Sequence, residues 1–364
     1  MKSAAVGTCT QTVGDRRRLG ARRPAPRLIC RSSATPTRDL VRPEINDAIE
    51  HALDSCLTTT DLPWGTRRQG KVRDTYDLGD KLAIVTTDRQ SAFDRILASI
   101  PFKGQVLNQV SSWWFNKTSD IVPNGLLSVP DPNVSIMDKV DVFPVEFVMR
   151  GFMTGSTETS LWTHYKNGSR NYCGNAFPDG LTKNSKLESE VLTPTTKSET
   201  RDVPVSAEEI LNRGLMTEED WEITSTFAKK LFSFGGQEAL KRGLLLVDTK
   251  YEFGKTKEGK IVVVDEVHTP DSSRYWLNDS YMERHMAGEE PESIDKEFLR
   301  LWFKDHCDPY KDEVLPEAPA SLVEELSRRY ILLYEKITGE EFELPDLSED
   351  RNSRIVSNLS GVVK

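Results

Sequence analysis

The sequence lacks several features that would place it at once in a particular class of protein. It contains no uninterrupted apolar run near the roughly 18–20 residues of a membrane span, which argues against a transmembrane helix. It also has no internal repeat, no coiled-coil heptads and no Walker-type phosphate loop. What remains is a globular chain of 364 residues, long enough for one large domain or two lobes.

Cysteine is scarce, and its positions form no pattern. No CxxC pair occurs, so the sequence predicts neither a zinc site nor a disulfide framework. A reducing compartment fits this usage best. The five residues are Cys9, Cys30, Cys56, Cys173 and Cys307.

Acidic residues are almost absent from the first 38 positions, where nine basic residues accompany the single acid Asp15. This segment is rich in Ser, Thr, Ala and Pro and has no long apolar core, which is typical of an organelle transit peptide rather than a secretory signal. We therefore expect residues 1–38 to be a disordered transit peptide for the chloroplast stroma, with the mitochondrion as the less favoured destination. A basic tail that binds an anionic partner is the alternative.

The rest of the chain is acidic. Without residues 1–38 it has 39 basic and 56 acidic residues, so the net charge is −17 instead of −9. An acidic body argues against nucleic acid as the partner. Any phosphate group must then be held by local basic side chains and by metal.

A predicted hairpin carries charges at the end of an apolar strand. Residues 244–247 form a short apolar run, as expected of a strand buried on both faces. From Asp248 onward the pattern alternates, so Asp248, Lys250 and Glu252 should share one face. Residues 254–259 are polar, contain two glycines and should form the hairpin loop.

The returning strand, 261–264, ends in two further acids, Asp265 and Glu266. Charges at the mouth of an apolar hairpin are costly unless they are paired or bind an ion. Mg²⁺ is commonly held by one or two carboxylates together with substrate phosphates. Glu252 and Asp265 are therefore candidate metal ligands if the register puts both on one face. A solvated strand end with surface ion pairs is the alternative.

An earlier segment offers cations for a nucleotide. Residues 69–77 and 81–87 read as a hairpin, in which Lys71 and Arg73 should point the same way. A glycine followed by two such cations can lie over phosphate groups, since Gly70 lets the backbone approach. Exposed strands often carry Lys and Arg, so an ordinary strand face remains the alternative.

A third candidate region follows the predicted strand 143–150. The strand leads into a turn, 151–156, that contains two glycines and two hydroxyl groups. Arg150 offers bidentate recognition of carboxylate or phosphate, and the hydroxyl group of Ser156 is a further donor. A helix expected near 157–165 would add N-terminal donors. An ordinary surface turn is the alternative.

Two loops complete the set of candidates. Residues 167–205 form a long polar stretch without obvious elements, which usually means a functional loop or disorder. Within it, the segment from Pro194 to Asp202 could supply substrate contacts. The segment 265–276 places acid, hydroxyl and arginine groups close together after a buried strand, while its His268 is more often structural than catalytic.

The other patterns predict packing. Apolar stripes predict helices over residues 42–57 and 105–117, and capping boxes predict helix starts at Ser206, Thr217 and Ser321. The helix that follows Ser321 should end at Gly339. A loop is expected over residues 119–141.

Together these motifs resemble those of the SAICAR synthetase family. The resemblance extends from about residue 62 to about residue 340, and the motifs are far more specific jointly than singly. They are Phe143–Arg150 with Thr154–Ser156, Leu246–Gly254, Gly70–Arg73, Ser91–Asp94, and Asp265–Glu266 with Pro270–Arg274.

The resemblance implies an ATP- and Mg²⁺-dependent ligase of purine biosynthesis. Such an enzyme joins the carboxylate of carboxyaminoimidazole ribonucleotide to the amine of L-aspartate, by way of an acyl phosphate, and gives SAICAR, ADP and phosphate. The implied fold is α+β and two-lobed, with antiparallel sheets and ATP in the cleft between the lobes. Residues 39–145 would form the smaller, ATP-binding lobe, and residues 146–364 the larger lobe for substrates and metal, with a helical C-terminal part.

The resemblance also implies roles for individual residues. ATP would be bound by Lys71, Arg73, Glu146 and Val148, and Mg²⁺ by Glu252 and Asp265. The nucleotide substrate would be bound by Arg150, Ser156, Asp271 and Arg274, while the catalytic residues would be Lys250, Lys197 and Asp202.

Two positions depart from the family pattern. Many relatives have His before the acid at position 202, where this chain has Arg201, which puts the local role in doubt. Arg73 replaces a common Lys and keeps the charge with a different geometry. A small-molecule kinase and a catalytically silent nucleotide-binding protein remain the rival interpretations, and the oligomeric state is left open.

Overall fold

The computed structural model describes residues 37–197 and 203–363, which lie in one compact unit. The expected transit peptide falls outside these residues except for Thr37 and Arg38. Both belong to the 3₁₀ helix η1, Thr37–Leu40, where the Thr37 hydroxyl donates to Glu325 at 2.9 Å. Within the described part of the chain, no helix is long and apolar enough to cross a membrane.

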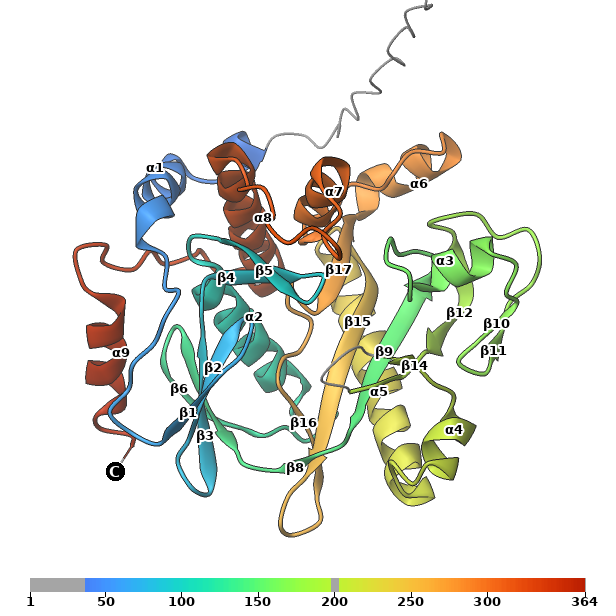
Figure 1. The fold of residues 1–364 in the computed structure, drawn as a ribbon, viewed down its shortest axis with the longest axis horizontal. Coiled ribbons are helices and arrows are strands. Elements are labelled where there is room, and N and C mark those ends of the chain that lie inside the picture. The colour runs from blue at the N-terminus through green and yellow to red at the C-terminus, as the bar shows by residue number, and fades with distance from the viewer. Residues whose placement is uncertain (1–36, 198–202, 364) are drawn as a thin grey trace, which may run out of the picture. The chain divides into compact units, whose positions relative to one another are not determined.

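The described helices surround two main sheets (Figure 1). A second 3₁₀ helix, η2, covers Leu53–Ser55. The α-helices are α1 Pro43–Ala52, α2 Lys103–Thr118, α3 Leu161–Lys166, α4 Ala207–Asn212, α5 Glu218–Lys241, α6 Asn278–Met286, α7 Glu297–His306, α8 Ala320–Thr338 and α9 Arg351–Leu359.

The first main sheet has five antiparallel strands in the order β1-β2-β3-β7-β6. A separate hairpin is formed by β4, Arg89–Ala92, and β5, Arg95–Ser99. The strands of the sheet are β1 Thr66–Gln69, β2 Arg73–Asp77, β3 Lys81–Thr86, β6 Leu126–Asp131 and β7 Val134–Asp138.

The second main sheet has eight strands, with β9 and β15 at its centre. All of its pairings are antiparallel, which agrees with the predicted α+β class. A small hairpin of β10, Asn171–Tyr172, and β11, Asn175–Ala176, forms a separate two-stranded sheet. The eight strands are β8 Asp141–Val142, β9 Val145–Phe152, β12 Lys186–Leu192, β13 Thr195–Thr196, β14 Val203–Pro204, β15 Leu244–Lys255, β16 Ile261–Val264 and β17 Ser273–Leu277.

The two sheets are joined by backbone hydrogen bonds at one loop. The Gly125 N–H donates to the Val263 carbonyl at 3.1 Å, and the Val263 N–H donates to the Pro123 carbonyl at 2.9 Å. The loop before β6 is thereby attached to β16, and the first sheet is held beside the second. The predicted division of the chain at residue 145 stays a prediction.

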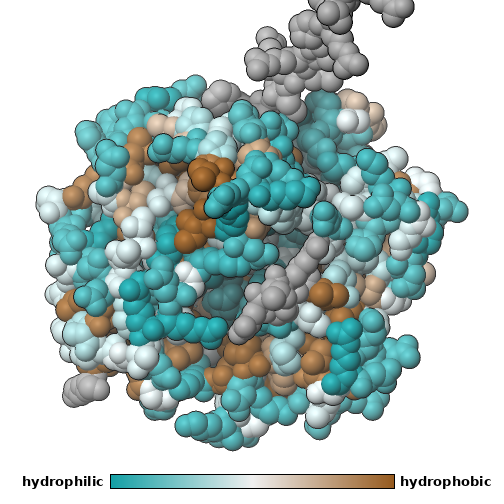
Figure 2. Space-filling model, viewed as in Figure 1, coloured by the Kyte–Doolittle hydropathy of each residue, from teal (hydrophilic) through white to brown (hydrophobic). Residues whose placement is uncertain are grey.

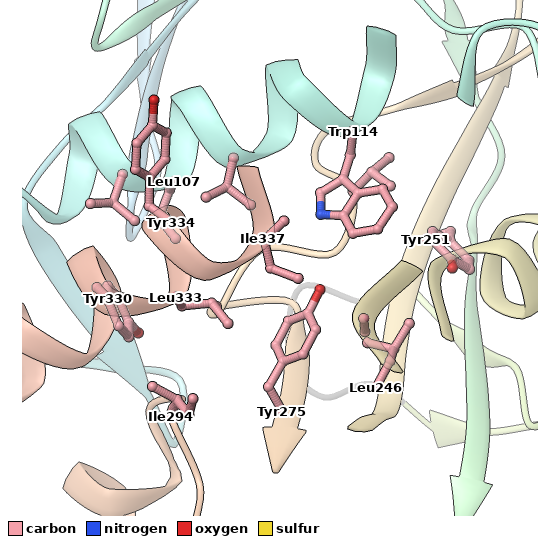
Figure 3. Close-up of a cluster of buried hydrophobic side chains, with 14 of the residues drawn as sticks. Leu107, Trp114, Leu246, Tyr251, Tyr275, Ile294, Tyr330, Leu333, Tyr334 and Ile337 are labelled. Carbon is pink, nitrogen blue, oxygen red and sulfur yellow. The ribbon is translucent and has the colours of Figure 1, made fainter. Parts of the chain in front are cut away.

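The main hydrophobic core lies between the second sheet and helices α2, α5 and α8. Figure 3 shows Trp114 of α2, Tyr275 of β17 and Ile337 of α8 pointing toward one another, and each is fully buried. On the α5 side of the sheet, the Phe147 ring stacks on Trp221 at a centroid distance of 5.5 Å. This apolar packing fixes which face of β9 and β15 is left for polar groups.

Residues 126–138 form a hairpin of β6 and β7, so the prediction of a loop over 119–141 was wrong for this part of the range. The prolines of this segment suggested a loop, but the one that falls within a strand, Pro130, is in β6, an edge strand of the five-stranded sheet, where a missing N–H is tolerated. In β7, Val134 and Ile136 are buried against Ile355 and Leu359 of α9. Tertiary packing thus outweighs the local turn signals.

Residues 167–205 also contain more structure than was predicted. β12 and β13 both pair with β9, and β14 pairs with β13, so parts of this stretch extend the second sheet. Its polar composition misled the prediction because these strands lie toward the solvent side of the sheet. Residues 198–202 lie outside the described residues, so the part of the prediction that concerns them is not tested.

Some element boundaries also differ from the predictions. The capping box at Ser206 is present, with Glu209 bonded in both directions, and the Thr217 side chain caps α5. At Ser321 the prediction was wrong, because α8 begins at Ala320, where Pro319 occupies the cap position without a side-chain bond. Gly151 lies inside β9 rather than in a turn, since strand pairing continues to Phe152.

His268 has a structural role, as its sequence context favoured. The ring is fully buried, contacts the Tyr251 hydroxyl and packs edge-on against Trp114. Burial lowers its pKa to about 3, so the imidazole is neutral at physiological pH. The ring lies so close to α5 that a Cβ on Gly235 would be 2.1 Å from His268 Cε1.

This contact predicts opposite effects for two neighbouring glycines. Gly235→Ala should destabilise the protein by about 1–3 kcal/mol because the buried ring must move. Gly236→Ala is the matched control: no atom lies within 4 Å of its added Cβ, and alanine should stabilise the helix by about 0.5–1 kcal/mol. Urea unfolding measures both changes, and equal effects at the two positions would contradict the packing described.

Candidate active site

The pairing of β9 with β15 produces one charged face and one apolar face. Lys250 lies opposite Val148, and Tyr251 lies opposite Phe147. Directly opposite residues of antiparallel strands share a face, and neighbours along a strand alternate. Tyr251 and Phe147 therefore belong to the buried apolar face, and Lys250 belongs to the polar one.

The prediction that Asp248, Lys250 and Glu252 share a face agrees with this register. Asp248 lies opposite Arg150, which adds Arg150 and Val148 of β9 to the same face. A cavity of about 310 Å³ opens above this face, and Figure 2 shows a hollow with hydrophilic surroundings near the middle of the molecule's drawn face. Glu146, Val148, Arg150, Lys250, Asp271, Arg274, Lys296 and Arg300 are among the residues that line the cavity.

At one end of this face, two lysines neutralise two carboxylates. Lys250 Nζ lies 2.5 Å from Glu146 Oε1 and 3.2 Å from Glu252 Oε1, while Lys197 contacts the other oxygen of Glu252. Burial alone would lower the pKa of Lys250, but Glu252 and Glu146 raise it well above its ordinary value. The ammonium group of Lys250 is thus permanently charged in this site.

Asp265 reaches this cluster by a bend rather than by strand register. Glu252 lies opposite Val264, so regular alternation would send the next side chain to the other face, and the register condition set for the metal site is not met. However, Asp265 follows the last residue of β16 and has a left-handed backbone, with φ of 64°. Its carboxylate interacts electrostatically with Glu252 and Lys250 despite the register.

The charge balance around Asp265 is unfavourable for a carboxylate. Arg73 lies 3.4 Å away and favours the charged form. Burial nevertheless raises the pKa of Asp265 to about 6, with a further increase from the nearby Glu252 and Glu266 carboxylates. Lys250 and Lys197 balance Glu146 and Glu252, so Arg73 alone faces both Glu266 and Asp265. One carboxylate is therefore in excess, and a cation would relieve its charge.

Lys71 and Arg73 do not extend from one strand face, as had been predicted. β2 begins only at Arg73, and Gly70 and Lys71 form a turn in which the Gly70 N–H donates to the Arg73 carbonyl at 2.8 Å. Arg73 pairs with Glu266 at 2.6 Å, whereas Lys71 pairs with the exposed Asp94 at 2.6 Å. The two cations therefore have different partners.

At the other end of the face, two arginines converge on one carboxylate. Asp248 Oδ2 lies 2.5 Å from Arg274 and 3.4 Å from Arg150, and Arg150 also donates to the Thr193 hydroxyl at 2.8 Å. Ser156 donates to Glu297, which lies 3.6 Å from Arg274. The predicted group of Arg150, Ser156 and Arg274 is thus brought together.

Asp271 connects this face to residues that were not predicted. Its carboxylate lies 3.4 Å from Lys103 and 3.5 Å from Lys296, and accepts hydrogen bonds from Gln90 and Tyr330. Burial would raise the pKa of Asp271, but Lys103 and Lys296 lower it well below its ordinary range. Asp271 is consequently ionised at any working pH.

Sequence reasoning missed Lys103, Lys296 and Arg300. Lys296 and Arg300 line the cavity from the start of α7, and burial lowers the pKa of Lys296 to about 8. The available signal was the concentration of charge in Asp295–Arg300 at the start of an amphipathic helix. No signal of that kind marks Lys103, which precedes an ordinary apolar stripe.

Only some of the other predicted site residues lie at the cavity. Glu146 and Val148 line the cavity, whereas Lys197 contacts Glu252, which is paired with the cavity residue Lys250. Asp202 lies outside the described residues, together with Arg201. Within the described residues, no group of three or more His, Cys, Asp or Glu side chains is placed to hold a metal by itself.

The arrangement suits binding and reaction of anionic substrates. Arginine and lysine side chains from separate strands and helices surround one cavity, and their counter-charges are buried carboxylates of the same chain. Arginine recognises carboxylate and phosphate groups by paired hydrogen bonds, and a fixed lysine stabilises negative charge that develops during a reaction.

Comparison with known proteins shows the family of the chain. A sequence model of SAICAR synthetase matches residues 66–317. The phosphoribosylaminoimidazole-succinocarboxamide synthase of Legionella pneumophila (strain Paris) is 63% identical over 304 residues, which cover 84% of this chain and 97% of that relative. The chloroplastic enzyme of the same name from Arabidopsis thaliana is 56% identical over 322 residues, covering 87% and 78% of the two chains.

Solved structures agree with this assignment. The SAICAR synthase of Saccharomyces cerevisiae, complexed with SAICAR, is 31% identical and superposes with a TM-score of 0.68, covering 79% of this chain and all of that one. A SAICAR synthetase in complex with ADP is 25% identical, with a TM-score of 0.59, and covers 77% of this chain and all of that one. From the matched motifs, the sheet arrangement and these relatives together, the chain belongs to the SAICAR synthetase family.

Proposed function

We propose that the charged face of β9 and β15 is where this chain carries out the reaction of its family. The chain is a phosphoribosylaminoimidazole-succinocarboxamide synthase of de novo purine biosynthesis. In the proposed route, a carboxylate oxygen of carboxyaminoimidazole ribonucleotide takes the γ-phosphoryl group of ATP, which leaves ADP and an acyl phosphate. The amine of L-aspartate then attacks the acyl carbon, forms the amide and releases phosphate.

One observation supports this use of the site above others. Arg150 and Arg274 lie at one end of the polar face, and Lys250 and Glu252 lie at the other, on strands paired in fixed register. An anionic nucleotide held by the arginines would extend its carboxylate toward Lys250. Such alignment of reacting groups removes much of the entropic barrier to a reaction between bound molecules.

The substrate roles follow from this orientation. Arg150, Arg274 and Ser156 bind the nucleotide phosphate, assisted by Lys296 and Arg300 from the start of α7. Asp271 accepts a hydrogen bond from an N–H or O–H group of the nucleotide. Lys197, next to Glu252, and Asp202, outside the described residues, serve the reacting carboxylate and the aspartate. Lys250 stabilises the charge that develops on the transferred phosphoryl group.

The ATP site is proposed to extend from this cluster toward the first sheet. Arg73 and Lys71 would hold phosphates, and Glu146 and Val148 of β9 would contact the remainder of the nucleotide. The ADP complex of a relative supports the use of ATP. Residues 39–145 would then form the smaller lobe and residues 146–364 the larger one.

The residues near Asp265 fit a magnesium ion. Glu252 and Asp265 supply hard carboxylate oxygens, and Mg²⁺ typically uses one or two of these together with water and phosphate. The raised pKa of Asp265, caused by burial and neighbouring acids, indicates unbalanced negative charge at this point. When bound, the ion would neutralise charge on the phosphoryl group during transfer.

The proposed reaction is tested by omitting one substrate at a time. We expect the purified protein to form SAICAR, detected by chromatography, only when ATP, Mg²⁺, carboxyaminoimidazole ribonucleotide and L-aspartate are all present. ADP release without aspartate should fall to a small fraction of the full rate. A small-molecule kinase would instead release ADP at the full rate without aspartate and make a phosphorylated product, and that result would refute the proposal.

The crowding of acids predicts an unusual gain of stability for Asp265→Asn. The pKa of Asp265 in the folded protein, about 6, lies above its ordinary value of 3.8. Between these two pH values the folded state binds more protons than the unfolded state, so the carboxylate lowers stability as pH rises. The ligand-free variant should be more stable than its parent above pH 6, by roughly 1–2 kcal/mol, and this gain should vanish below about pH 4.

Thermal unfolding at pH 4, 5, 7 and 8 measures this dependence. Asp80→Asn, at an exposed turn of the β2–β3 hairpin, is the control and should change stability little at any of these values. A gain for Asp265→Asn that is the same at pH 4 and pH 8 would contradict the proposed charge crowding.

We also propose that the basic segment at the start of the chain directs it to the plastid. Its composition carries this proposal, and chloroplastic relatives in Arabidopsis thaliana and Vigna aconitifolia support it. A fluorescent reporter fused after residues 1–38 should accumulate in plastids of plant cells, while one fused to a variant with its arginines replaced by alanine should stay outside. Retention of the first reporter in the cytosol, or its import into mitochondria, would refute plastid targeting.

A further inference from the structure

Lys103 is a charged residue in an unusually unfavourable place. It is the first residue of α2, its side chain is fully buried, and its Nζ makes no hydrogen bond to any described residue. Burying an ammonium group with unused donors is costly. A cation in the first turn of a helix is also repelled by the positive end of the helix dipole.

The backbone around Lys103 holds it in this place. Phe102, at the N-cap, has a left-handed backbone with φ of 62°, and the Gly104 N–H donates to Asp88 Oδ1 at 2.9 Å. A Cβ on Gly104 would lie 2.3 Å from the Thr86 carbonyl oxygen, so only glycine permits this approach of α2 to β3. The start of α2 is thus locked, and the direction of the Lys103 side chain is locked with it.

Among the described residues, Asp271 is the one ion-pair partner of Lys103, while Glu266 acts on its charge from farther away. The Nζ–Oδ2 distance is 3.4 Å. Burial lowers the pKa of Lys103 and the Asp271 carboxylate raises it, which shows how strongly each group depends on the other. A buried ion pair of this kind seldom adds stability over an apolar pair of similar size. The stability of the fold therefore does not explain why a lysine is present at position 103. The need to hold Asp271 in position does explain it.

Asp271 lines the substrate cavity and is held from several directions. Gln90 of β4 and Tyr330 of α8 donate to Oδ1 at 3.2 and 3.0 Å, and Lys296 lies 3.5 Å from the same oxygen. Lys103 approaches the second oxygen, Oδ2. The carboxylate is therefore oriented at both oxygens, and Lys103 is the group that acts on Oδ2.

We propose that Lys103 is a positioning residue for the nucleotide substrate, acting through Asp271. Its ammonium group keeps the Asp271 carboxylate ionised and aimed into the cavity, where Asp271 accepts a hydrogen bond from an amino or hydroxyl group of the nucleotide. Lys103 touches no substrate itself. This inference rests on the proposed function and adds to it a residue outside the cavity lining.

The first test is Lys103→Met, which keeps the length of the side chain and removes its charge. The KM for carboxyaminoimidazole ribonucleotide should rise at least about tenfold. This is the effect expected when the hydrogen bond from the nucleotide to the charged Asp271 carboxylate loses its alignment. The KM values for ATP and aspartate should change less than about threefold. Equal changes in all three KM values, or an unchanged KM for the nucleotide, would overturn the proposal.

The matched control is Lys255→Met, at the end of β15. Lys255 also pairs with a buried carboxylate, Asp220, at 2.6 Å, but lies outside the site. This variant should lose stability and keep the nucleotide KM of the parent. A rise in the nucleotide KM for the control as large as for Lys103→Met would show that loss of any such ion pair suffices, and would overturn the proposal.

A double-variant cycle shows whether Lys103 acts through Asp271. In an Asp271→Asn background, adding Lys103→Met should change the nucleotide KM less than about threefold, because the group it positions is already altered. If the rise in the nucleotide KM of the double variant equals the product of the rises in the two single variants, the proposal is overturned. If Lys103→Met alone does not fold, the double variant, in which neither member of the Lys103–Asp271 pair keeps its charge, still permits this comparison with Asp271→Asn.

The outcomes separate this inference from the proposed function. If the parent protein makes no SAICAR with all substrates present, the proposed function fails. If it makes SAICAR and Lys103→Met leaves the nucleotide KM unchanged, the proposed function stands and the positioning role is wrong.

Discussion

The register between β9 and β15 is the constraint on which the rest of the site depends. It places Phe147 and Tyr251 against the core and leaves Val148 and Lys250 on the opposite face. A shift by one residue would exchange the two faces, bury the charges and expose the aromatic rings. The apolar packing on α5 therefore fixes the polar face as strictly as any direct contact among the charged groups.

The polar face is balanced by carboxylates of the same chain. Each cation at the cavity has an acidic partner, such as Asp248 for Arg150 and Arg274, or Glu146 for Lys250. These pairs hold the side chains in place before substrates arrive, which lowers the cost of ordering them on binding. The exception is the pair of acids Asp265 and Glu266, which share Arg73, so that one negative charge is in excess and a metal ion would restore the balance.

The sequence predicted the parts of the fold that have strong local signals. The alternation from Asp248 gave the correct face of β15, and the cap at Ser206 marked the start of α4. The hairpin of β6 and β7 was missed because Pro130 lies on an edge strand, which local patterns do not identify. Asp265 reaches the site because its own backbone is left-handed, which the alternation of the sequence does not indicate. Lys103 reaches Asp271 only through the tertiary contact of α2 with the loop before β17. What was missed depends on contacts between distant parts of the chain.

We propose that strand pairing and one backbone bend together create the metal and phosphate site on this face. The most direct measurement is a crystal structure with ADP and Mn²⁺ in place of Mg²⁺, in which anomalous scattering locates the ion. We expect a peak about 2.0–2.3 Å from carboxylate oxygens of Glu252 and Asp265 and next to the ADP phosphates. An ion bound elsewhere, with both carboxylates still paired to Lys197 and Arg73, would contradict it.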